Sequence, residues 1–155
     1  MRPSQLAIIL TLAVVVFFMA FYGCFPRNHD PAVEYHDTAA EAYAAARDDA
    51  ARLGGLTFVV LGTRSMEPLL WGGDYIVVDP GVSVDKVELG RVITYHAEWQ
   101  QPGQPPVTYR ITARDAYGLI VAGDNVKGLD HPENRYRVTA ANYVGAVTKI
   151  HRTRL

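Results

Sequence analysis

The chain has 155 residues, which is room for one domain and a short appendage. Its formal net charge is −1 with 20% charged residues, which excludes the strongly basic surface expected of a nucleic-acid-binding protein. The only cysteine is Cys24, so an intramolecular disulfide and a thiolate metal site are both excluded.

The N-terminal segment is the most apolar part of the chain. Residues 3–26 carry no charge, and residues 6–22 read LAIILTLAVVVFFMAFY. As a helix, this run spans roughly 26 Å, close to the hydrocarbon thickness of a thin bilayer. A cleaved secretory signal needs small residues at its cleavage site, and none are well placed here. A lipoprotein signal would use Cys24, but Phe21 and Tyr22 fit poorly where such signals have small and leucine-like residues. We therefore predict an uncleaved membrane anchor over residues 1–25.

Residues 26–55 are predicted to form a linker and a short helix. The linker, residues 26–36, is polar and contains two prolines. Thr38 is placed to cap an alanine-rich helix that runs to about Leu53, and Gly54 and Gly55 end it. The apolar stripe of this helix is weak, which predicts a spacer on the domain or membrane surface, not a core element.

Residues 56–155 change to short apolar runs separated by turn residues. Such runs favour strands, and we expect them at LTFVVLG, DYIVVDP, RVITYHA, PVTYRITA, YGLIVAG and YVGAVTKI. Without a convincing helix among them, they predict a mainly β domain, a compact and partly closed β-barrel or sandwich.

Several motifs follow one another in this domain. They are Ser65-Met66-Glu67-Pro68, Gly73-Asp74-Tyr75-Ile76-Val77-Val78, Gly90-Arg91-Val92-Ile93-Thr94-Tyr95, Tyr109-Arg110-Ile111, Gly123-Asp124-Asn125 with the later Asp130, and Tyr143-Val144-Gly145-Ala146-Val147. In this order, behind an N-terminal anchor, they resemble the type I signal peptidases, membrane-bound serine proteases that remove signal peptides. The resemblance implies the β-fold of that family and a site at the first motif.

The resemblance also implies roles for individual residues. Ser65 would be the nucleophile, and its backbone N–H and the Thr63 hydroxyl would form the oxyanion hole. Met66 and Pro68 would border the substrate. Asp124 and Asp130 would orient the site, although Gly-Asp-Asn is equally good tight-turn material. Leu69, Leu70 and Trp71 fit either an apolar lip that faces the membrane or simple core packing.

The sequence departs from the family at the general base. Signal peptidases carry a lysine or a histidine directly before the arginine, and this chain has Tyr109 there. A tyrosine with a pKa near 10 keeps its proton at neutral pH, so it is a poor acceptor for the serine proton. This departure puts catalytic activity in doubt.

His96 is the alternative base that the sequence suggests. A symmetric hairpin between RVITYHA and PVTYRITA would place it beside Tyr109, whereas a slip of one residue would turn it away. Lys127 and His131 are lesser candidates. The remaining histidines, His29, His36 and His151, are expected on the solvated surface, and no spacing predicts a metal site or a cofactor.

Two functions are consistent with these patterns. The first is a membrane-anchored serine endopeptidase that cleaves signal peptides from preproteins, with its domain on the extracytoplasmic side of a bacterial-type inner membrane. The second is a catalytically impaired relative that binds extended peptides by strand addition without hydrolysis. In both cases the expected partners are extended peptides and the lipid bilayer, not nucleic acid.

Overall fold

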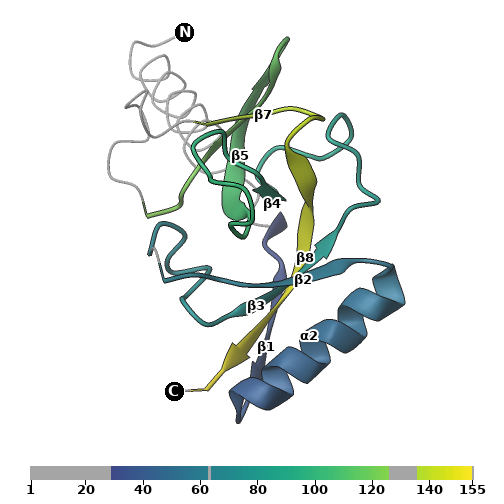
Figure 1. The fold of residues 1–155 in the computed structure, drawn as a ribbon, viewed down its shortest axis with the longest axis vertical. Helices are drawn as coiled ribbons and strands as arrows, with labels where there is room; N and C mark the ends of the chain where they lie inside the picture. The colour runs from purple at the N-terminus through teal and green to yellow at the C-terminus, as the bar shows by residue number, and fades with distance from the viewer. Residues whose placement is uncertain (1–28, 63, 126–135, 155) are drawn as a thin grey trace, which may run out of the picture.

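The computed structural model describes residues 29–62, 64–125 and 136–154, which form a mainly β domain with one helix among these residues (Figure 1). The elements are β1 (Ala32–His36), α2 (Ala39–Leu53), β2 (Leu56–Val59), β3 (Tyr75–Asp79), β4 (Val92–Tyr95), β5 (Val107–Asp115), β6 (Gly118–Ala122), β7 (Tyr136–Val138) and β8 (Tyr143–Thr153). The six strands expected from the sequence are all confirmed.

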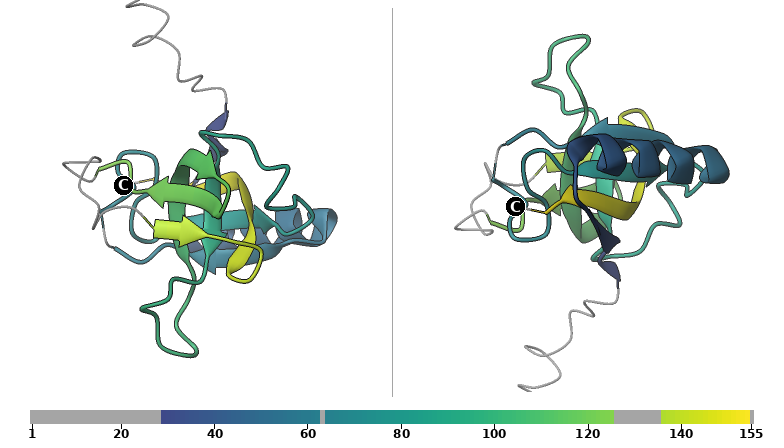
Figure 2. Two further views of the ribbon diagram at one scale, coloured as in Figure 1. Left: turned by 90° about the horizontal axis from the view of Figure 1, so that it is seen from above. Right: turned by 90° about the horizontal axis from the view of Figure 1, so that it is seen from below.

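The strands form one curled sheet in the order β2-β3-β8-β4-β5-β6-β7, with β1 pairing with β8 off this path. Its pairings are antiparallel except for the parallel contact between β1 and β8. The sheet curls into a half-barrel, and the connection between β4 and β5 extends away from its body (Figure 2). The prediction of a mainly β domain with a partly closed sheet is confirmed.

Helix α2 forms where the sequence places it. The Thr38 side chain accepts a hydrogen bond from the backbone N–H of Glu41, and the Glu41 carboxylate accepts one from the backbone N–H of Thr38. Gly54 ends the helix with a φ of 63°. The prediction that α2 contributes nothing to the core was wrong. Ala42 and Ala46 are fully buried, because their small side chains let the helix lie close against the sheet.

The polar segment before α2 also differs from its prediction. Residues 32–36 are not a linker but strand β1, paired in parallel with the end of β8 so that Glu34 lies opposite His151. With this pairing β8 extends to Thr153, and His151 is completely buried. The expectation that His151 is a solvated residue of the tail was therefore wrong, and His36 is half-buried as well.

The interior of the half-barrel contains two apolar clusters. One is centred on Ile93, Ile111, Leu119 and Val121 and the other on Met66, Leu70, Ile76 and Ile150. Tyr109 packs against both clusters, so it lies where they meet. A side chain in this position is held in place from two directions.

The helix in the described part of the chain, α2, lacks the length and hydropathy needed to cross a bilayer. The predicted anchor, residues 1–25, lies outside the described residues.

Candidate functional site

The Ser65 motif lies in a loop that leaves β2 and returns to β3. The ladder between these strands continues past their ends, since the N–H of Val60 donates to Asp74 at 2.8 Å and that of Gly73 donates back to Val60 at 2.9 Å. The intervening segment therefore forms a closed loop. Arg64 has a φ of 57°, a conformation that costs energy for a side chain other than glycine and often accompanies functional loops. Thr63, the predicted oxyanion-hole residue, lies outside the described residues.

The structure brings Ser65 and Tyr109 together. Ser65 is half-buried in a turn, a few residues beyond the end of β2. Its side chain is hydrogen-bonded to Tyr109. The expectation that Tyr109 faces Ser65 is confirmed, whereas the roles of both residues in a reaction remain predictions.

Tyr109 is less acidic than a tyrosine in water. Burial raises the pKa of Tyr109, and the nearby ring of Tyr136 raises it further, whereas the hydrogen bond with Ser65 acts in the opposite direction. The ring centroids of Tyr109 and Tyr136 are 5.6 Å apart. The net effect favours the neutral phenol, which retains its proton at neutral pH.

Ser65 and Tyr109 border a cavity of about 280 Å³ between β2 and the first residues of β5. Arg64 and Tyr109 are the only ionisable side chains among its described lining residues. Gln100, Gln104 and Thr108 add neutral polar groups. The rest of the wall is apolar or glycine and comes from Phe58, Val59, Val60, Leu61, Met66, Leu70, Gly72, Ile76, Trp99, Pro105, Pro106 and Val107.

Two strand edges flank this cavity. Within the described residues β2 pairs only with β3, so its other edge is not covered by a strand. At the start of β5, residues 107–109 pair with β4, whereas the pairing with β6 begins only at Arg110. An extended chain lying in the cavity would run beside both edges, the geometry that strand addition requires.

The Gly-Asp-Asn segment lies directly against the serine loop. The backbone N–H of Asn125 donates to the carbonyl of Ser65 at 2.8 Å, and the Asn125 side chain donates to that of Arg64 at 3.0 Å. Asp124 instead accepts two hydrogen bonds of 2.7 Å from Arg110, which raise the pKa of that guanidinium. Asn125 therefore positions the loop, while Asp124 has a structural role away from Ser65. Asp130 lies outside the described residues.

Sequence reasoning missed an ion pair that braces the other end of the loop. The Arg152 guanidinium donates to both carboxylate oxygens of Asp74 and to the carbonyl of Leu69, at 2.9, 2.6 and 2.8 Å. Asp74 is almost fully buried and also accepts from the N–H of Trp71. A buried aspartate at the start of a strand signals such a partner, but its location on β8 is visible only in the fold.

The predicted position of His96 was wrong. Strand β4 ends at Tyr95, and the residue opposite Tyr109 is Ile93. His96 is exposed and does not line the cavity; it borders an adjoining hollow that shares Phe58, Gln100, Gln104, Pro105 and Pro106 with it. The other candidate bases, Lys127 and His131, lie outside the described residues.

Some of the residues that follow Ser65 line the cavity, and others are exposed on the surface of the domain. Met66 and Leu70 are buried in the core and also line the cavity. Leu69 packs against the same core, so core packing describes Leu69 and Leu70, whereas Trp71 is exposed. Pro68 is exposed and is not part of the cavity wall, and its carbonyl accepts a hydrogen bond from the indole of Trp71 at 2.9 Å. Of the two residues predicted to contact substrate, the structure places only Met66 at the cavity.

No protein-family model matches this chain, and no curated protein is similar to it at a significant level.

Proposed function

We propose that this domain binds extended peptides by strand addition, in the cavity between β2 and the start of β5. The observation that carries this proposal is the position of the hydrogen-bonded Ser65–Tyr109 pair beside a cavity flanked by two strand edges. A peptide backbone between these edges would bond to both, and its alternate side chains would point into the apolar wall.

The cavity indicates the kind of peptide. Its described wall has no carboxylate, and Arg64 and Tyr109 are its only ionisable groups. Small or apolar side chains therefore fit it better than charged ones, which would lose hydration without gaining a partner. The resemblance to signal peptidases suggests the same class of ligand, a preprotein segment with small residues, presented at a membrane in which residues 1–25 are the anchor.

Hydrolysis at this site is expected to be slow or absent. A serine attacks an amide only when a base takes its proton, and the group beside Ser65 is a tyrosine whose pKa is raised further by burial. The phenol would instead donate a hydrogen bond. We therefore favour a catalytically impaired, signal-peptidase-like protein.

One observation favours a second candidate, an active serine endopeptidase. Asn125 is bonded directly to the Ser65 loop, which is more support than a peptide-binding surface needs. Lys127 follows Asn125 by two residues in the sequence. In this second candidate Lys127 or His131 would replace the missing base, and the substrate would be the signal peptide of an exported preprotein.

The test measures binding and cleavage of one peptide by the full chain in detergent. The peptide spans the junction between a generic signal sequence and its mature protein. Binding is followed by fluorescence anisotropy and cleavage by mass spectrometry. Val59→Glu places a charge in the cavity wall, and Leu89→Glu is its matched control, because Leu89 is similarly exposed but does not line the cavity.

Binding without cleavage, weakened at least tenfold by Val59→Glu alone, supports the first proposal. Cleavage that is lost in Ser65→Ala while binding remains supports the second. Equal binding by the two glutamate variants, or no binding by the wild type, would contradict both.

A further inference from the structure

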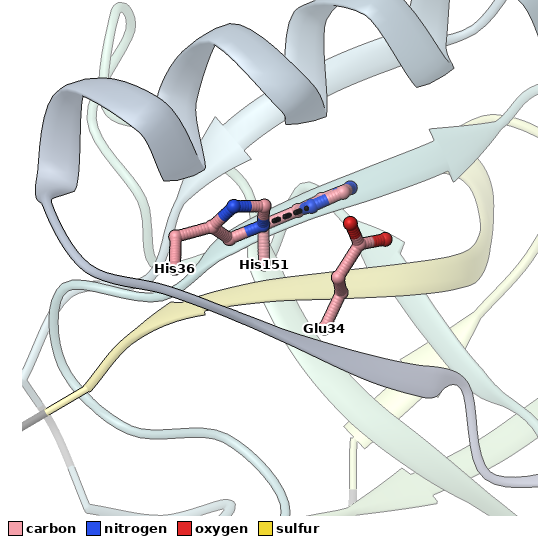
Figure 3. Close-up of side chains that lie close together, drawn as sticks. All are labelled: Glu34, His36 and His151. Carbon is pink, nitrogen blue, oxygen red and sulfur yellow. Dashed lines mark hydrogen bonds between the residues drawn. The ribbon is translucent and has the colours of Figure 1, made fainter.

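A cluster of metal-ligating side chains lies on the face of the sheet that α2 covers, away from the peptide cavity. Glu34 and His36 extend from β1 and His151 from β8, and all three side chains point toward one another (Figure 3). The parallel pairing of the strands sets Glu34 opposite His151 and brings His36 to the same face two residues later.

The donor atoms are close enough to share one ion. One donor atom from each residue lies within 4.8 Å of the others, and Nε2 of His36 is 2.9 Å from Nδ1 of His151. Two nitrogens bound to one tetrahedral Zn²⁺ are about 3.3 Å apart, as follows from Zn–N distances of about 2.05 Å. The imidazoles therefore need to separate by only a few tenths of an ångström.

Asp49 on α2 orients the buried histidine. The His151 side chain is only 1% exposed, and its Nε2 lies 3.0 Å from a carboxylate oxygen of Asp49. The carboxylate favours a proton on Nε2, which leaves the lone pair of Nδ1 directed at His36. Histidines that bind zinc commonly have such a carboxylate on their second nitrogen. His36 becomes a ligand when its proton moves to Nδ1, which keeps the ring neutral.

Lys149 selects the kind of metal. Its ammonium lies 2.5 Å from Glu34 and 2.7 Å from Asp49, and Arg52 also pairs with Asp49. The two carboxylates are therefore balanced by two cations, and the cluster has little net negative charge to attract Mg²⁺ or Ca²⁺. Two neutral imidazoles favour zinc and its neighbours in the first transition series.

We propose that Glu34, His36 and His151 bind one Zn²⁺-type ion that ties β1 to β8. The donor atoms belong to segments far apart in the sequence, so the unfolded chain does not hold them together. Bound metal therefore stabilises the folded state, by an amount that rises with free metal concentration.

The test is zinc binding by the full chain in detergent, with any affinity tag removed. Calorimetry should show one Zn²⁺ per chain and no binding of Mg²⁺. At a free zinc concentration 100 times the Kd, Tm should rise by about 5 to 10 °C relative to EDTA. His36→Gln and Glu34→Gln should each weaken zinc binding at least tenfold. His96→Gln is the matched control, because it removes an exposed histidine outside the cluster and should leave the Kd unchanged.

Lys149→Gln provides a measurement that keeps all three ligands. Removing the neighbouring positive charge should tighten zinc binding by about threefold to tenfold. The melting temperature of every variant in EDTA shows whether it is folded. No zinc binding by the wild type, or unchanged binding in either ligand variant, would overturn the assignment. Unchanged or weaker binding in Lys149→Gln would also overturn it.

Discussion

Replacing Tyr109 by lysine should give the site the base that it lacks. The lysine amine would start from the same backbone position on β5, within the reach that the phenol now has toward Ser65. Burial disfavours an ammonium there, and the described cavity wall has no carboxylate to stabilise it. The amine would therefore lose its proton more readily than in water.

The size of the effect follows from general-base catalysis. A lysine with a pKa lowered by about 2 from its usual value of about 10.4 is roughly a quarter neutral at pH 8. A well-placed base contributes about 100- to 10,000-fold to rate. Together these values predict that kcat/KM of Tyr109→Lys exceeds that of the wild type by about 30- to 3,000-fold.

The substitution also removes an aromatic ring from the core. Tyr109 packs against Tyr95 and Tyr136 with centroid separations of 6.3 and 5.6 Å, and losing these contacts should cost about 1 to 3 kcal/mol of stability. Tyr109→Met is the matched control, since it has a similar unbranched side chain and no amine. Its stability should fall by a comparable amount.

The assay is cleavage of a fluorogenic peptide with small residues before the scissile bond, measured between pH 6 and 10. Activity of Tyr109→Lys should rise with pH through an apparent pKa below about 10.4 and should vanish when Ser65→Ala is added. If Tyr109→Lys is folded and binds peptide but cleaves no faster than Tyr109→Met, the assignment of this position as the base site is wrong.

Three further predictions concern the framework around the site. Asp124→Asn leaves the mostly buried guanidinium of Arg110 with a weaker partner and should lower the free energy of unfolding in urea by about 1 to 3 kcal/mol; a change below about 0.5 kcal/mol would contradict the importance of this pair. The Tyr143 hydroxyl is buried without a hydrogen-bond partner among the described residues, and burial raises the pKa of Tyr143 to about 12. The neutral form of Tyr143 stabilises the folded state below pH 10, and this stabilisation is lost as pH rises through 12. Over that range the free energy of unfolding should therefore fall less in Tyr143→Phe than in the wild type, and equal falls would refute this. Gly145→Ala would put a Cβ 2.6 Å from the carbonyl of Asp79 and should lower Tm through a loss of about 2 kcal/mol or more, whereas an unchanged Tm would show that the strands separate easily.

The strands from residue 56 onward were predictable because each is a short apolar run between turn residues. The register of the hairpin formed by β4 and β5 was not predictable from the sequence. The sequence suggests that β4 continues to Ala97, but the side chain of Gln100 accepts a hydrogen bond from the N–H of Ala97 and donates one to the carbonyl of Pro105. Pro105 and Pro106 have no N–H to offer a ladder, so pairing begins only at Val107. This shift moves His96 away from Tyr109.

The candidate site was predictable in part. The Ser65 motif and the base position at Tyr109 were found because they are local motifs that resemble those of a known family. The structure places the side chains of Ser65 and Tyr109 in contact. The histidine cluster gave no such signal. His36 and His151 are separated by nearly the whole domain, and only the parallel pairing of β1 with β8 joins them. A short polar strand of this kind has no periodicity that distinguishes it from a linker.

The place of β8 in the sheet has a consequence for how the protein is made. This strand pairs with β1, β3 and β4, yet it is the last of the described strands to leave the ribosome. Until it emerges, β1 has no partner strand among the described residues, and β3 is joined to β2 alone. Contacts between such distant segments also form slowly. The nascent domain should therefore expose unpaired strand edges throughout its synthesis, a state to which molecular chaperones would bind first.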